Sequence, residues 1–121
     1  MTMLNDAKGT EFQKIYIACG KTDLRQGIQG LASLIQFRFK LDPYQKGTIF
    51  MFCGSRKDRI KCLLWEGDGF LLLYKRLSNG HFCWPRNADD LKDITPEQFR
   101  WLMEGLTIEK TIHPSNPKYI G

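Results

Sequence analysis

The chain contains four cysteines, but no two of them are close enough to form a CxxC motif. Structural zinc sites usually combine cysteines a few residues apart, whereas these stand at positions 19, 53, 62 and 83. His81 and His113 could add ligands, yet the long gaps argue against a shared site. We therefore expect no metal site and no cofactor, with the thiols buried as small apolar side chains.

The sequence also lacks the long apolar segments of membrane proteins. No run approaches the about 20 residues that a membrane-spanning helix requires. Residues 1–9 have neither the basic segment nor the apolar run of a secretory signal peptide. We expect a cytoplasmic protein with reduced thiols and no membrane partner.

Recognisable catalytic motifs are missing as well. The sequence has no Walker loop and no dinucleotide-binding fingerprint. His81 and Cys83 would lie about 7 Å apart on one strand face, too far for a direct hydrogen bond. Glu66 and Asp68 are explained by the hairpin turn Gly-Asp-Gly at 67–69. We expect no catalytic residue and no enzymatic activity.

The length and composition that are present favour one globular domain. The chain has 121 residues, of which 42% are hydrophobic and 26% charged, and a domain of this size buries roughly two-thirds of its unfolded surface. The formal net charge of +5 weakly favours a polyanionic partner. We expect a single domain over 1–121, with a flexible arm over 1–11, a globular core over 12–112 and an extended tail over 113–121.

Local patterns predict a strand and a helix in the first third of the chain. Apolar residues favour a strand over 14–19, followed by a break at Gly20. Between Leu24 and Phe39 the apolar residues recur at helical spacing, which predicts one buried helix face. The preceding Thr22-Asp23 pair offers an N-cap for this helix.

A second helix is predicted near the end of the core. Thr95 is a good N-cap, Pro96 suits the first helical position, and Gln98 is placed to complete a capping box. A short edge strand is expected over 108–112.

The middle of the chain, residues 48–85, predicts a meander of three hairpins. Its turns are expected at 54–58, 66–69 and 78–80, where Gly, Asn, Asp and Ser gather. The strands between them are rich in aromatic and aliphatic residues. The predicted fold class is therefore α+β, an antiparallel β-meander of four or five strands packed against two helices.

Turn length fixes the predicted register of the second hairpin. A two-residue turn at Gly67-Asp68 places one set of residues in opposite pairs on a single face. These pairs are Trp65–Phe70, Leu63–Leu72, Lys61–Tyr74 and Arg59–Arg76. The other face carries Ile60, Cys62, Leu64, Leu71 and Leu73, a core surface.

The same alternation assigns faces to the neighbouring strands. The first face gains Phe50 and Phe52 and, from the third hairpin, His81 and Cys83, whereas Phe82 and Trp84 join the core face with Lys75 beside Trp84. The first face is thus expected to divide into an aromatic half and a cationic half.

The cations on this face predict an anion-binding surface. Arg59 directly opposite Arg76 is destabilising unless an anion, or a carboxylate from elsewhere in the chain, lies between them. Phosphate is a good candidate, because guanidinium groups bind it at two points. Aromatic rings beside cations also suit stacking on unpaired bases. The alternative is a solvated charged face that Asp58 or Glu66 neutralises locally. The candidate DNA-binding residues are Arg56, Lys57, Arg59, Lys61, Lys75 and Arg76, and the candidate stacking or partner surface is Trp65, Phe70 and Tyr74.

Several short segments resemble a known family. They are TDLRQGIQGL at 22–31, DRIK at 58–61, WEGDGF at 65–70, YKRL at 74–77, FCWP at 82–85 and WLMEGL at 101–106. In this order and spacing, across roughly 14–106, they resemble the accessory protein TnpB of IS 66-type insertion sequences. The resemblance implies a bacterial protein encoded beside a separate transposase and needed for efficient transposition. It implies no catalytic residues.

The leading hypothesis is a non-catalytic accessory protein for DNA transposition that contacts DNA, at the element ends or non-specifically, through the basic sheet face. The alternative is a protein–protein interaction module that docks on the transposase of the same element or self-associates as a homo-oligomer. A metal-dependent hydrolase or nuclease is a third option.

Overall fold

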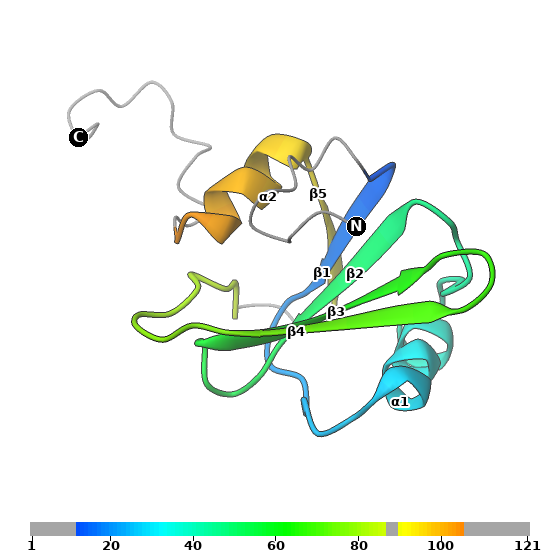
Figure 1. The fold of residues 1–121 in the computed structure, drawn as a ribbon, viewed down its shortest axis with the longest axis horizontal. Helices are drawn as coiled ribbons and strands as arrows, with labels where there is room; N and C mark the ends of the chain where they lie inside the picture. The colour runs from blue at the N-terminus through cyan, green and yellow to red at the C-terminus, as the bar shows by residue number, and fades with distance from the viewer. Residues whose placement is uncertain (1–11, 87–89, 106–121) are drawn as a thin grey trace.

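The computed structural model describes residues 12–86 and 90–105 (Figure 1). They form a five-stranded sheet with one helix on each face. The elements in chain order are β1 Lys14–Ala18, α1 Ile28–Ser33, the π-helical turn η2 Leu34–Arg38, β2 Thr48–Cys53, β3 Arg59–Trp65, β4 Phe70–Arg76, β5 Leu91–Ile94 and α2 Pro96–Met103. The expected arm over 1–11 and tail over 113–121 lie outside the described residues, so that division of the chain stays a prediction.

The sheet order is β4-β3-β2-β1-β5. Strands β2, β3 and β4 form an antiparallel meander, β5 runs antiparallel to β1, and β1 runs parallel to β2. The α+β class with a mostly antiparallel sheet and two helices is confirmed. The parallel pair arises because the chain crosses from β1 through α1 to β2, a connection that a simple meander lacks.

The predicted register of the β3–β4 hairpin is confirmed. Arg59 pairs with Arg76, Lys61 with Tyr74, and Trp65 with Phe70. The two-residue turn closes through the Glu66 amide, which donates to the Gly69 carbonyl at 2.9 Å. Gly67 has a φ of +98°, a conformation that glycine adopts without steric cost.

The third predicted hairpin is wrong. Residues 81–86 form no strand, because the Phe82 amide donates to the Lys57 carbonyl in the β2–β3 turn at 2.7 Å. Phe82 and Trp84 are buried as predicted, and the Trp84 indole donates to the Ala18 carbonyl at 2.8 Å. The prediction of Cys83 on the basic face depended on that hairpin; its half-buried thiol instead donates to the Gly105 carbonyl at 3.0 Å.

Each face of the sheet packs on one helix, and Figure 1 shows α1 and α2 on opposite sides. On the α2 face, Phe99 and Leu102 pack against Ile60, Cys62 and other core residues. On the α1 face, the core contains Leu31, Ile35, Phe50, Phe52 and Leu63. Phe50 and Phe52 lie on the predicted face of the sheet, opposite Leu63 and Lys61, but they are 1% and 0% exposed beneath α1, so this part of the face is closed.

The first helix begins later than predicted. Its N-cap is Gly27, which makes no side-chain cap. Asp23 accepts a hydrogen bond from the Arg25 amide at 3.0 Å, and the Gln26 amide donates to the Asp23 carbonyl at 3.2 Å. A short polar side chain that bonds locally offers the backbone an alternative to the helix, so Thr22-Asp23 forms a turn instead of a cap.

The start of α2 tests one further prediction. The capping box of α2 is confirmed: the Gln98 amide donates to Thr95 Oγ1 at 3.0 Å, and the Thr95 amide donates to Gln98 Oε1 at 2.9 Å. Strand β5 was not predicted. The strand expected over 108–112 lies outside the described residues.

Candidate nucleic-acid interface

An open groove of about 960 Å³ lies on the α1 face, beside the loop that precedes that helix. The loop before α1, the β2–β3 turn and the facing strands β3 and β4 contribute its walls. Its lining residues are Lys21, Thr22, Asp23, Leu24, Arg25, Gly54, Ser55, Arg56, Arg59, Lys61, Leu72 and Tyr74. We call this hollow the basic groove, because five of these residues are Lys or Arg and one is acidic.

Close backbone contacts bring the two loops of the basic groove together. The Thr22 amide donates to the Cys53 carbonyl at 2.8 Å. Gly54 follows directly, and a Cβ at this position would lie 3.2 Å from the Leu24 side chain. The absence of a side chain at Gly54 therefore lets Leu24 pack closely and form part of the apolar lining.

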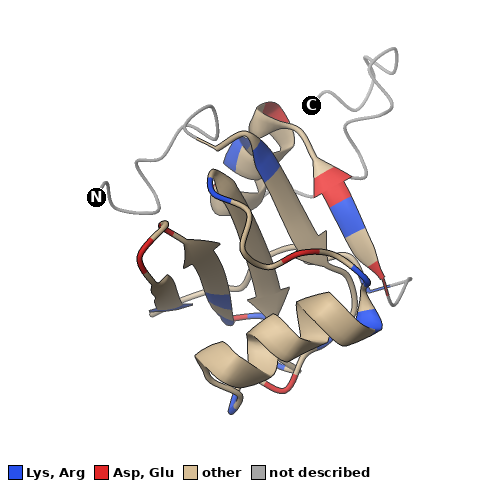
Figure 2. Cartoon of the chain, turned by 90° about the vertical axis from the view of Figure 1, so that its right-hand side faces the viewer, with Lys and Arg blue, Asp and Glu red and all other residues tan. Residues whose placement is uncertain are grey.

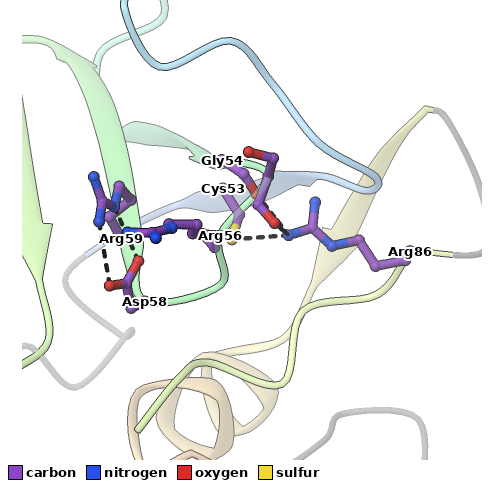
Figure 3. Close-up of polar contacts among 7 residues, drawn as sticks. Cys53, Gly54, Arg56, Asp58, Arg59 and Arg86 are labelled. Carbon is purple, nitrogen blue, oxygen red and sulfur yellow. Dashed lines mark hydrogen bonds and ion pairs between the residues drawn. The ribbon is translucent and has the colours of Figure 1, made fainter. Parts of the chain in front are cut away.

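Arg86 ties the same loops together from outside the groove lining (Figure 3). Its Nη1 donates to the Gly20 carbonyl at 2.8 Å, and its Nη2 donates to the Gly54 carbonyl at 2.6 Å and to Cys53 Sγ at 3.7 Å. A planar guanidinium can hold several acceptors in fixed directions. Arg86 thus positions the backbone that carries Lys21 and Arg56.

Asp58 partly neutralises the pair of facing arginines. Its carboxylate accepts hydrogen bonds from Arg59 Nε at 2.9 Å and Nη2 at 3.3 Å (Figure 3). These bonds lower the pKa of Asp58 below its ordinary value and raise the pKa of Arg59. The predicted local neutralisation is therefore present for Arg59. Asp58 uses two of the five N–H donors of that guanidinium, so donors remain for another anion.

Two further cations of the groove have internal partners. Lys61 Nζ donates to the Gln26 carbonyl at 3.0 Å and lies 5.8 Å from the centre of the Tyr74 ring. Arg25 forms a two-point ion pair with Asp23, with both side-chain bonds at 3.0 Å. That pair lowers the pKa of Asp23 to about 2.

The remaining two groove cations, Lys21 and Arg56, differ from Arg59 and Arg25 in having no acidic partner among the described residues. Among residues 12–86 and 90–105, neither Lys21 nor Arg56 forms an ion pair, and both are exposed. Figure 2 shows that Lys and Arg also occur on β5 and α2. The basic groove therefore stands out by the convergence of its cations on one hollow.

The structure brings together some of the predicted cations and separates another. Arg56, Arg59 and Lys61 line the basic groove. Lys57 is exposed in the same turn, and Arg76 is exposed opposite Arg59. Lys75 pairs with Ile60 and therefore points to the α2 face. Burial raises the pKa of the Cys62 thiol to about 12 on that face, and the positive charge of Lys75 has a smaller, lowering effect on the same pKa.

The predicted stacking residues are also divided. Tyr74 lines the basic groove. Trp65 and Phe70 lie at the opposite end of their strands, where their ring centres are 4.9 Å apart and pack against Tyr44 at 5.0 and 5.2 Å. This second aromatic cluster does not extend into the groove.

Sequence reasoning missed Lys21, Arg25 and Arg86. The first two were assigned to a break and to the helix, although a Thr-Asp pair followed by Arg25 also fits a local turn. Nothing in the local pattern around Arg86 indicates its contacts with Gly20 and Gly54, because these partners are distant in sequence.

Two other kinds of site are absent from the described residues. No group of three or more His, Cys, Asp or Glu residues in this part of the chain could hold a metal ion. None of the helices formed by residues 12–86 and 90–105 is long and apolar enough to cross a membrane.

Comparison with known proteins gives a consistent assignment. The model of the family described as "IS66 Orf2 like protein" matches residues 13–113. Two proteins of Sinorhizobium fredii (strain NBRC 101917 / NGR234) are similar over 93 residues. "Uncharacterized protein y4jC" is 38% identical over 77% of this chain and 79% of its own length, and "Uncharacterized protein y4hO" is 36% identical over 77% and 80%. No solved structure matches at a significant level. The chain therefore belongs to the IS66 Orf2-like family, as the sequence resemblance predicted, and this membership implies an accessory role in transposition.

Proposed function

We propose that this protein is a non-catalytic accessory factor of transposition that contacts the phosphate backbone of DNA through the basic groove. The observation that carries the proposal is the convergence of five Lys and Arg residues on one hollow with a single acidic lining residue. DNA is the polyanion that a transposition factor encounters, and neutralising its phosphates releases counterions.

The ion pairing of the individual cations supports phosphate binding by the basic groove. Elsewhere on the surface, Lys14 pairs with Asp93 at 3.1 Å, and Arg100 lies 3.7 Å from both Glu97 and Glu104. Lys21 and Arg56 have no such acid within the described residues. Their charge therefore remains available to a phosphate, and a concave site lined by one sign of charge concentrates the field.

Arg59 and Lys61 have a supporting part in this proposal. Arg59 keeps free donors after bonding to Asp58, and Lys61 is held in place by the Gln26 carbonyl. Arg76 and Lys57 extend the cationic surface beyond the groove. Lys75 is not part of this surface, because it points to the α2 face.

A salt titration with DNA tests the proposal. We expect the affinity of the full chain for a short duplex to fall steeply with salt. The double variant Lys21→Gln/Arg56→Gln should bind more weakly, and its logarithmic salt slope should be shallower by about 0.9 for each phosphate that it no longer neutralises. Arg100→Gln is the control, since it removes one positive charge outside the groove. Absence of binding at low salt, or an equal loss of affinity in the control, would contradict the proposal.

A protein–protein interaction module is the second candidate. One observation favours it: Phe37 on η2 is 67% exposed and Ile28 at the start of α1 is 38% exposed. These apolar side chains lie on the helix that covers the sheet and could meet the transposase of the same element or a second copy. Phe37→Ser should abolish co-purification with the transposase in nuclease-treated extracts if this candidate is right. Retained co-purification would exclude Phe37 from the interface.

A further inference from the structure

Tyr74 is an unusual lining residue for a groove that binds phosphate alone. Its side chain is 53% exposed, whereas Phe50 and Phe52 on the same face of the sheet are buried. Leu24 and Leu72 line the same hollow. A surface for phosphates needs cations, and this apolar and aromatic lining adds nothing to such contacts.

A positively charged neighbour lies beside the Tyr74 ring. Lys61, its partner on β3, lies 5.8 Å from the ring centre, within the range of a cation–π contact. The Lys61 ammonium is itself fixed by its bond to the Gln26 carbonyl. The ring therefore lies beside a groove cation whose own position is fixed.

Such a ring can meet a nucleobase only when the base is unpaired. In a duplex the base faces are stacked on one another and only the base edges and phosphates are accessible. Sites for single strands combine a cationic path for the backbone with aromatic rings on which bases stack. Tyr74 with Leu24 and Leu72 offers a surface for a base face, and Lys21 and Arg56 lie in the same groove to meet the phosphates.

We propose that the basic groove binds an unpaired nucleotide of DNA, with the base stacked on Tyr74 and the adjoining phosphates on Lys21 and Arg56. Single-stranded DNA is then a better ligand than a duplex of the same sequence. This inference rests on the proposed function, because it specifies which form of DNA the same groove takes.

Paired measurements on single-stranded and duplex DNA test the inference. The affinity of the full chain for a labelled oligonucleotide and for its duplex is measured by fluorescence anisotropy at one salt concentration. Tyr74→Ala should weaken single-strand binding about 5- to 150-fold, the range for loss of one base–aromatic stack, and should change duplex binding far less. Tyr74→Phe keeps the ring and should retain single-strand affinity.

The chain supplies a matched control in Tyr44. It is also 53% exposed, but it packs against Trp65 and Phe70 at the other end of the hairpin. Tyr44→Ala should leave the affinity for both forms unchanged. If the Tyr74→Ala variant does not fold, Tyr74→Leu keeps apolar bulk without the aromatic face and should show the same selective loss.

The possible failures are distinguishable. Equal effects of Tyr74→Ala on single-strand and duplex binding, or no effect on either, would overturn the inference and leave the phosphate contact of the groove standing. Absence of binding to both forms at low salt would remove the proposed function together with the inference.

Discussion

Arg59 and Arg76 are cross-strand partners at the outer end of the β3–β4 hairpin, and the Asp58 carboxylate bonds to the first of them at 2.9 Å. Like charges directly opposite each other destabilise a strand pair. Asp58 offsets this repulsion, and the charge of Arg76 contributes to the lowered pKa of Asp58 after the larger effect of Arg59. The repulsion is thus partly offset within the protein before any ligand binds.

The balance predicts a coupled effect on stability. Asp58→Asn should lower the Tm by a few degrees at neutral pH, because Arg59 then loses its carboxylate partner and the repulsion between Arg59 and Arg76 is no longer offset. In an Arg76→Ala background the same substitution should cost less, since the repulsion is already gone. Thermal unfolding of the four proteins of this cycle measures the coupling. Equal costs in both backgrounds would show that Asp58 acts on Arg59 alone.

Arg86 predicts an effect on the groove from a residue that does not line it. Arg86→Met removes the donors to the Gly20 and Gly54 carbonyls. Hydrogen bonds to charged groups are worth about 1.5–3 kcal/mol, so the Tm should fall by several degrees and DNA affinity should fall with it. Arg86→Lys keeps the charge but not the planar fork and should restore only part of both losses. Unchanged Tm in Arg86→Met would contradict this role.

The Asp23–Arg25 pair predicts a specific acid titration. The carboxyl of Asp23 should titrate by NMR with a pKa of about 2, below its ordinary value of 3.8, because Arg25 bonds to its ionised form. Since the folded-state pKa is lowered, the stabilising contribution of this pair is present above pH 3.8 and is lost as the pH falls toward 2. Arg25→Gln should return the pKa toward 3.8; a midpoint unchanged by this substitution would exclude Arg25 as the cause.

The cysteines should differ in their reactivity toward alkylating agents. Burial raises the pKa of Cys53 to about 11 and that of Cys62 to about 12, whereas Cys83 is only half-buried. In the native protein at about pH 8, iodoacetamide should therefore modify Cys83 well before the other two. Mass spectrometry of the digested protein measures the order, and the unfolded chain, in which all thiols react, is the control. Early modification of Cys62 would show that the β3 core opens easily.

Local rules predicted the β3–β4 hairpin and the α2 cap, whose partners are close in sequence, but failed for the hairpin expected at 78–80 and for the start of α1. The β3–β4 register follows from a two-residue turn and alternating faces, and the α2 capping box involves residues three positions apart. Strand β5 could not be found in this way. Its Lys92 and Asp93 are exposed, and its strand form depends on pairing with β1.

The residues of the basic groove that lie on neighbouring strands were predictable, whereas those that long-range contacts bring there were not. Arg59, Lys61 and Tyr74 could be placed on one face from alternation alone. The contribution of Lys21 and Arg25 depends on the bond between the Thr22 amide and the Cys53 carbonyl, which joins distant segments. The helix that covers Phe50 and Phe52 likewise decides that their part of the face is closed.

Strand β1 lies between β2 and β5 in the sheet, so its pairing can be completed only after β5 has been synthesised. The hairpins of β2, β3 and β4 can close from neighbouring segments as they leave the ribosome. Strand β1 is made before its partners β2 and β5, and β5 ends only at Ile94. Until that residue emerges, one edge of β1 lacks its pairing strand, and open edges recruit other chains. A product truncated before Leu91 lacks β5 and also α2, which covers the core on one face, and should therefore aggregate even though it contains the entire basic groove.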